Sequence, residues 1–174
     1  GLLVAFFSLF PDDDLWGLAL FSSQTFGFWM FTASLIALFS AKHYTAGINV
    51  ALYVYFMFYI TGVFKRLSGV NNGYNTLAYF WNGLWQELTY GLLPAAVCFV
   101  MAFVLWFGRK NKLIFILLRF LPLLFILAEA FLIWSRVISR NQGLFMAVID
   151  TVCAVGYLVI ILKESSFQSQ KHLR

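Results

Sequence analysis

The stretch Leu113–Trp134 has the sequence LIFILLRFLPLLFILAEAFLIW and decides the class of fold. Arg119 and Glu129 are its only ionisable side chains. The stretch is long enough to cross the hydrocarbon core of a bilayer, which is about 30 Å thick and requires about 20 apolar residues of helix. Backbone polar groups inside a bilayer must be satisfied within the chain, so this stretch predicts a transmembrane α-helix.

Composition extends this prediction to the whole chain. Of its 174 residues 62% are hydrophobic and 11% are charged, with a mean hydropathy of +0.84, whereas a soluble domain is about 45–50% apolar and 25% charged. The net charge of +5 comes from basic residues in short loops and in the tail, where they act as topology signals. We therefore expect one all-α domain over residues 1–174, a polytopic bundle in contact with the lipid bilayer, and no nucleic-acid partner.

Charged and turn-forming residues divide the chain into six expected crossings. The first looks truncated, because the chain opens at Gly1 within an apolar run. An interfacial segment around residues 79–85 is expected to precede the fourth crossing. The six expected crossings are residues 2–10, 24–41, 46–64, 88–107, 113–134 and 143–162.

The basic residues of the loops predict the orientation. Seven of them fall on one side of the expected bundle, and four fall on the other side together with the acidic run Asp12–Asp14. Cytoplasmic loops carry an excess of Lys and Arg, so both termini are expected in the cytoplasm. The seven are Lys42, Arg109, Lys110, Lys112, Lys163, Lys171 and Arg174, and the four are Lys65, Arg66, Arg136 and Arg140.

Three carboxylates, Glu87, Glu129 and Asp150, lie in or beside expected spans, where an ionisable group is costly and suggests a functional site. Counting helical turns brings them to a similar depth in the outer half of the bundle. An outward-facing cavity lined by these acids would attract a small cationic or amphipathic solute, and aromatic rings would add cation–π attraction. The other residues expected to line this cavity are Gln24, Trp85, Tyr90 and Trp134.

Two other interpretations of the acids stay open. Glu129 and Arg136 are seven residues apart on one helix face, which would suit a structural ion pair, and Glu87 would be hydrated at the interface. The acids would also suit a proton or ion pathway. Cys98 and Cys153 fall within apolar spans and are expected to act as small hydrophobic side chains. The chain has no catalytic motif, so we expect neither an enzyme nor a metal or other cofactor.

A stripe of small residues follows the second expected span. Ala33, Ala37 and Ala41 are spaced four residues apart, and small residues let a neighbouring helix approach closely. Packing inside the bundle is one interpretation, and a docking face for a second membrane protein is the other.

The segment TFGFWMFTASLIALFSAK (Thr25–Lys42), followed by AGINV (Ala46–Val50), resembles small bacterial six-span membrane proteins of uncharacterised function. This resemblance implies a multi-pass protein of the bacterial inner membrane and implies no activity. In layout the chain is also similar to the substrate-binding subunits of energy-coupling-factor transporters. Those have six helices, inside termini, an outward pocket and an alanine-rich face that docks the transporter core, which the alanine stripe of the second expected span would match.

The leading hypothesis is a membrane-embedded binding or transport subunit for a small amphipathic or cationic solute. The chain has no obvious second half for alternating access, so transport would require a second membrane protein or a homo-oligomer. The alternative is an interaction protein, such as an immunity, chaperone or regulatory subunit, that binds another membrane protein through its helix faces. The residues expected to take the solute in the leading hypothesis are Glu87, Glu129, Asp150, Trp85 and Tyr90.

Overall fold

The computed structural model confirms the all-α class. Its described part contains helices and short turns and no strand. The expected first crossing and Gln24 lie outside the described residues, apart from Phe6 and Phe7. The structure describes residues 6–7, 15–16, 26–71, 76–109 and 113–171.

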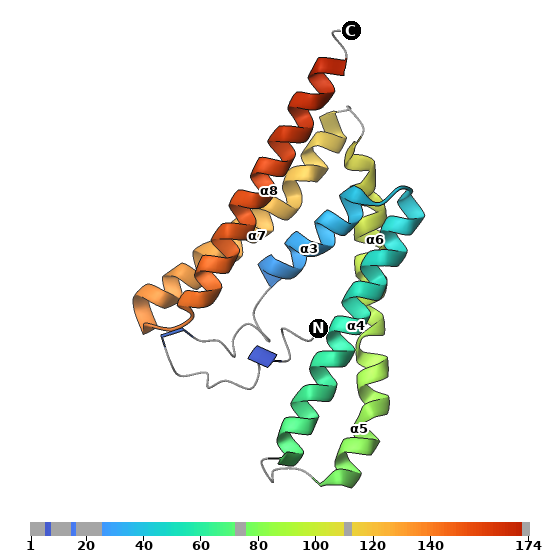
Figure 1. Ribbon diagram of the computed structural model, residues 1–174, viewed down its shortest axis with the longest axis vertical. Coiled ribbons are helices and arrows are strands. Elements are labelled where there is room, and N and C mark those ends of the chain that lie inside the picture. The colour runs from blue at the N-terminus through green and yellow to red at the C-terminus, as the bar shows by residue number, and fades with distance from the viewer. Residues whose placement is uncertain (1–5, 8–14, 17–25, 72–75, 110–112, 172–174) are drawn as a thin grey trace.

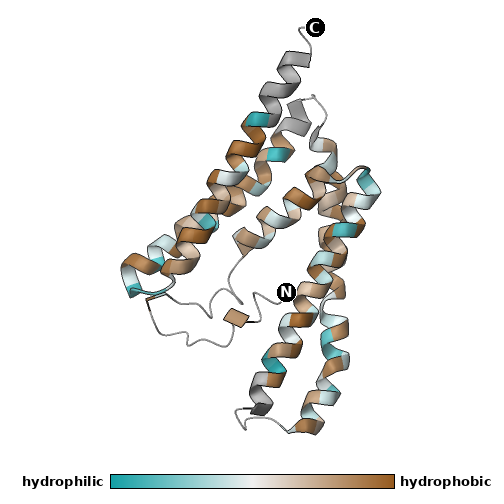
Figure 2. Cartoon of the chain, viewed as in Figure 1, coloured by the Kyte–Doolittle hydropathy of each residue, from teal (hydrophilic) through white to brown (hydrophobic). Residues whose placement is uncertain are grey.

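Six α-helices and one short 3₁₀ helix make up most of this part. Brown and tan predominate over most of the described helices, whereas white and teal are more frequent along the helix over residues 77–90 (Figure 2). The helices are α3 Phe26–Phe39, α4 His43–Asn71, α5 Leu77–Tyr90, α6 Leu92–Trp106, α7 Leu113–Arg140 and α8 Leu144–Lys171, with the 3₁₀ helix η1 at Phe107–Arg109.

Two antiparallel hairpins form the frame of the molecule (Figure 1). α4 packs against α5 and α6, and α7 packs against α8. α3 lies obliquely between the hairpins and contacts α4, α6, α7 and α8. Because α6 and α7 touch only slightly, α3 is the main link between the two hairpins.

Four segments are long and apolar enough to cross a membrane, which indicates an integral membrane protein. They are His43–Leu67, Leu77–Trp106, Leu117–Arg140 and Leu144–Lys163. α3 is also apolar but has only 14 residues. At 1.5 Å per residue it rises about 21 Å, which is less than the thickness of the hydrocarbon core.

The fourth expected crossing lies within a longer candidate span. The sequence predicts an interfacial segment around residues 79–85 and a crossing over 88–107, whereas the structure has one candidate span over 77–106. This span consists of α5 and α6, which only Gly91 separates. Pro94 explains the break, because a proline donates no hydrogen bond to the carbonyl four residues earlier and its ring clashes with that carbonyl.

Two apolar clusters fill the space on either side of α3. Both include small side chains, which allow the helices to approach closely. The buried residues between α3, α7 and α8 are Leu38, Leu123, Ile126, Cys153, Ala154, Tyr157 and Ile161. Those between α3, α4 and α6 are Ala37, Ala46, Val50, Val54 and Ala102.

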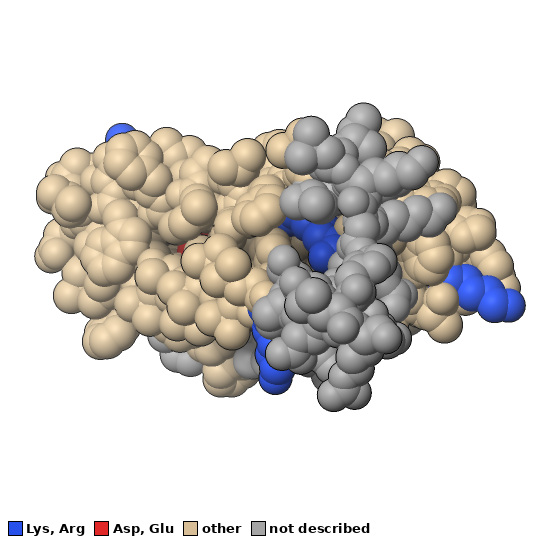
Figure 3. Space-filling model, turned by 90° about the horizontal axis from the view of Figure 1, so that it is seen from above, with Lys and Arg blue, Asp and Glu red and all other residues tan. Residues whose placement is uncertain are grey.

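The helix ends alternate between two ends of the molecule. The ends of α3, α6 and α8 and the start of α7 lie toward one end, and the turn between α7 and α8 and the junction of α4 with α5 lie toward the other (Figure 1). Seen from the first end, the surface shows Lys and Arg side chains, whereas Asp and Glu are almost hidden (Figure 3). The number of crossings and the orientation stay predictions.

Candidate functional site

Glu129 from α7 and Asp150 from α8 meet at the start of α3. A methyl group built on Gly27 would lie 2.6 Å from Asp150 Oδ1 and 3.0 Å from Glu129 Oε2. The two carboxylates therefore face the same point on α3, and Gly27 is the residue that lets them approach. We call Glu129 and Asp150 the carboxylate pair.

The first turn of α3 explains the position of Glu129. The first N–H groups of a helix have no partner within the helix. Here the Phe26 N–H donates a hydrogen bond of 3.0 Å to Glu129 Oε1, and the Gly27 N–H faces the same carboxylate. A helix N-terminus also favours negative charge through its dipole. Glu129 thus caps a helix that lies more than one hundred residues earlier in the chain.

Asp150 has no such partner. Its side chain is 0% exposed, and neither of its oxygens has a hydrogen-bond partner in the described chain. Glu129 Oε2 is also buried without a partner. No Lys or Arg among the described residues forms an ion pair with either carboxylate. Burying a charged carboxylate without a partner is costly, so Asp150 lies in an environment that disfavours its ionised form.

Buried apolar residues flank each carboxylate along its own helix. Along α7, Glu129 lies between the buried residues Ile126 and Ile133. Along α8, Asp150 lies between Ala147 and Cys153, which are both buried. Asp150 is thus shielded from solvent, whereas Glu129 is half-buried, and the low local dielectric around Asp150 strengthens its electrostatic interactions.

Glu87 is separated from the pair and has a partner of its own. Its Oε1 is 2.8 Å from Arg66 Nε, and the two side chains are 17% and 13% exposed. Arg66 also donates to Gln86 at 3.2 Å and lies over the ring of Tyr79, with 5.4 Å between Cζ and the ring centroid. This ion pair joins α4 to α5, which is the hairpin on the other side of α3.

Two glycines make room for that ion pair. A methyl group at Gly62 would overlap the carboxylate of Glu87, and one at Gly83 would overlap the guanidinium of Arg66. Gly62 lies four residues before Arg66, and Gly83 lies four residues before Glu87. Each helix therefore presents one charged residue and one glycine on the same face, and each charge packs against the glycine of the other helix.

Of the three acids expected at one cavity, two lie together in the structure. The structure brings Glu129 and Asp150 together, but it places Glu87 on the other hairpin. Counting turns gives the depth of a residue but does not give the neighbour that its side chain faces. The proposed ion pair between Glu129 and Arg136 is absent as well, since Glu129 binds the Phe26 N–H instead.

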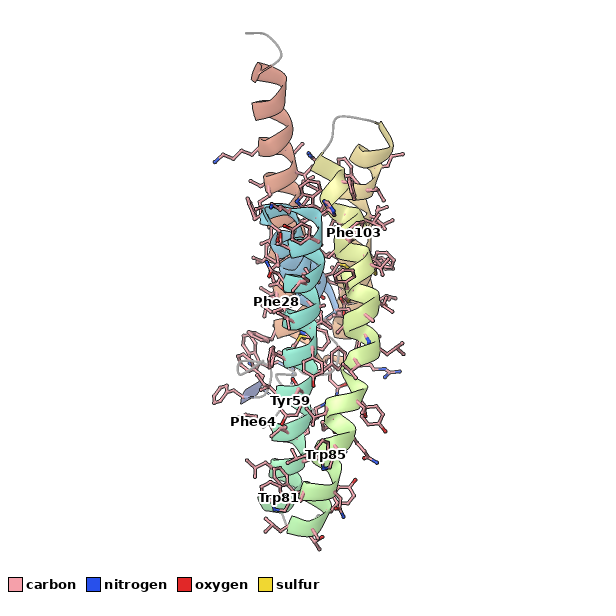
Figure 4. All side chains as sticks on the ribbon, turned by 90° about the vertical axis from the view of Figure 1, so that its right-hand side faces the viewer. Phe28, Tyr59, Phe64, Trp81, Trp85 and Phe103 are labelled. Carbon is pink, nitrogen blue, oxygen red and sulfur yellow. The ribbon has the colours of Figure 1, made fainter. Side chains whose placement is uncertain are left out.

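The aromatic residues expected to line the cavity lie outside the carboxylate pair. Trp85 and Tyr90 are 75% and 65% exposed, on the surface of the α4–α5–α6 hairpin. Figure 4 shows Trp81 and Trp85 along α5, with Trp81 farther from Phe103. Exposed aromatic side chains of this kind are typical of the membrane interface. Trp134 lies on α7 and donates from its indole nitrogen to Thr151 Oγ1 at 3.0 Å, so it links α7 to α8.

The three residues of the alanine stripe lie in three different environments. Ala37 is 0% exposed and packs between α3, α4 and α6. Ala33 is partly buried against the same cluster. Ala41 is exposed and follows the end of α3. Ala37 therefore serves packing inside the bundle and is absent from the surface.

A separate cavity of about 230 Å³ lies between α3, α4, α6 and α7. Its lining is almost wholly apolar and includes no charged side chain and neither member of the carboxylate pair. Ile126, which is fully buried, lies on α7 between Pro122 at the cavity and Glu129. The other residues that line it are Met30, Ala33, Ser34, Val50, Cys98, Val100, Met101, Ala102, Val104, Leu105, Leu118 and Leu121.

Comparison of the chain with protein-family models, with curated proteins and with solved structures finds no match. Any functional conclusion therefore depends on the geometry of the chain itself.

Proposed function

We propose that the protein is a membrane-embedded subunit that binds a small amphipathic or cationic solute at the carboxylate pair. Asp150 carries this proposal, because it is fully buried and has no partner in the described chain. A positive group that reaches the pair would offset the charge of both carboxylates in a medium of low dielectric.

The contrast with Glu87 supports a binding role over a structural one. Glu87 is neutralised by Arg66, and two glycines provide the space for this ion pair. A structural acid in this protein is thus matched with a cation. Glu129 and Asp150 have no such match among the described residues, and intramembrane acids of this kind commonly mark solute, ion or proton sites.

In the proposed arrangement, the chain crosses the inner membrane of a bacterial cell six times with both termini in the cytoplasm. The carboxylate pair then lies in the outer half of the bundle, and solute enters from the outer side. Transport requires a partner or a second copy of the chain, because a bundle of this size lacks two repeats that alternate around one site. The excess of basic residues in the loops assigned to the cytoplasm, seven against four, supports this orientation.

A thermal-unfolding screen in lipid nanodiscs tests the proposal. The probes are choline, tetraethylammonium and benzyltrimethylammonium chloride, each compared with sodium chloride at the same ionic strength. We expect at least one organic cation to raise the unfolding temperature of the wild type, since a ligand that binds only the folded state stabilises it. Glu129→Gln and Asp150→Asn should abolish that rise.

Glu87→Gln is the matched control, because it removes an acid at another position in the bundle. It is expected to lower the baseline stability and to keep the rise caused by the cation. Identical rises in the wild type, Glu129→Gln and Asp150→Asn would overturn the proposal. An absence of any rise in the wild type would also overturn it and would favour the interaction protein.

A further inference from the structure

The carboxylate pair has a geometry that limits what can occupy it. Asp150 Oδ1 and Glu129 Oε2 lie 2.6 and 3.0 Å from one point beside Gly27, and neither has a hydrogen-bond partner in the described chain. A methyl group does not fit at that point. The two oxygens are therefore packed closely against the backbone of α3.

A metal ion fits this space poorly. Calcium takes six to eight oxygen ligands, and magnesium requires near-octahedral geometry. Among the described residues no group of three or more His, Cys, Asp or Glu side chains is placed to hold a metal. The start of α3 adds only N–H groups, which donate to Glu129 and cannot serve as metal ligands.

A proton needs fewer ligands and less space than a metal ion. Two oxygens suffice to hold it, and it occupies almost no volume. Two carboxylates that approach one point this closely, one of them fully buried, cannot both be ionised without strong repulsion, and one shared proton removes that repulsion. Glu129 already has hydrogen bonds that suit its ionised form, whereas Asp150 has none. Asp150 is therefore the residue that carries the proton.

The other titratable groups near the pair are few. α7 contributes Glu129, α8 contributes Asp150 and the buried thiol of Cys153, and the first turn of α3 contributes backbone N–H groups. No charged side chain from α3 faces the pair. Among these groups the carboxylate pair itself is the one that can exchange a proton with a solute cation.

We infer that the carboxylate pair holds one proton between Asp150 and Glu129 and releases it when a cationic solute binds. On release the O–H bond of Asp150 breaks, its electron pair stays on the oxygen, and the proton passes to water. The solute then supplies the positive charge that the proton supplied before. The exchange rests on the proposed function, whereas the proton itself does not depend on it.

Infrared spectroscopy of the protein in nanodiscs tests the proton directly, without any solute. We expect the C=O stretch of a protonated carboxyl group at neutral pH, shifted by H₂O-to-D₂O exchange. Asp150→Asn should remove this band. Glu129→Gln should keep it at a changed frequency, because the proton loses its charged neighbour, and Glu87→Gln should leave it unchanged. Size-exclusion profiles show whether each variant is folded.

The binding of the organic cations at several pH values tests the exchange. Release of one proton predicts an affinity that rises by up to about tenfold per pH unit over the range in which the pair is protonated. A missing band in the wild type, or a band that persists in Asp150→Asn, would overturn the inference. A band that behaves as expected without any effect of the cations would support the proton site and overturn the proposed function. A band together with an affinity that does not depend on pH would overturn the exchange.

Discussion

Glu129 Oε1 accepts a hydrogen bond from the backbone N–H of Phe26 at 3.0 Å and thereby joins the first turn of α3 to the middle of α7. α3 is too short to be held by a long packing face, and it links two hairpins that otherwise touch only slightly. The orientation of α3 therefore depends on the same carboxylate that forms half of the candidate site. A change of charge at Glu129 should therefore alter the packing of α3 against both hairpins.

Gly27→Ala should displace the carboxylate pair. The added methyl group would lie 2.6 Å from Asp150 Oδ1 and 3.0 Å from Glu129 Oε2, and overpacking of a buried site costs about 1–3 kcal/mol. We expect a lower thermal-unfolding temperature and a loss of cation binding. Gly156→Ala is the matched control, since its methyl group would lie at an ordinary 3.7 Å from Phe31 and alanine favours a helix interior. Equal stability of the two variants would contradict the described packing around Gly27.

The ion pair of Arg66 with Glu87 should show strong coupling in a double-mutant cycle. Removal of one member leaves a largely buried charge without a partner, which costs about 3–5 kcal/mol in fully buried pairs and less here because both side chains are slightly exposed. We expect Arg66→Met and Glu87→Leu each to destabilise the protein, and the double variant to be more stable than the sum of the two effects implies. Additive effects in unfolding measurements would show that the pair contributes no coupling.

The sequence predicts the features that depend on length and on position along a helix. Apolar runs give the class of protein, and counting turns gives a similar depth for Glu129 and Asp150, which the structure brings together. The neighbour of a side chain depends on how helices pack, which counting cannot give. Glu87 shows this limit, because its partner is Arg66 on the adjacent helix.

Local signals for some of these features are nevertheless present in the sequence. Gly62 and Gly83 each precede a charged residue by four positions. This spacing puts the glycine and the charged residue on one face of the helix, so that the charged side chain of each helix can pack against the glycine of the other. Pro94 gives the reason for the break at Gly91. Gly27 has no such signal, since only the approach of α7 and α8 shows why a side chain is excluded there.

Ala37→Leu should destabilise the bundle more than Ala33→Leu. Ala37 is 0% exposed and packs against Ala46 and Val50, so extra methyl groups at this position force the helices apart at a cost of about 1–3 kcal/mol. Ala33 lines the cavity of about 230 Å³, which can take up part of a larger side chain. Thermal unfolding in nanodiscs measures the difference. Equal losses at the two positions would mean that the cavity does not relieve overpacking.

The orientation predicts opposite labelling of two engineered cysteines. In a background that lacks Cys98 and Cys153, we expect Asn72→Cys to react with a membrane-impermeant maleimide added to intact cells. Asn111→Cys should react only after the membrane is permeabilised, because it lies among the basic residues assigned to the cytoplasm. The parent without cysteines controls for labelling of other groups, and denatured samples show that both thiols are reactive. Labelling of position 111 in intact cells would reverse the orientation and place the carboxylate pair in the inner half of the bundle.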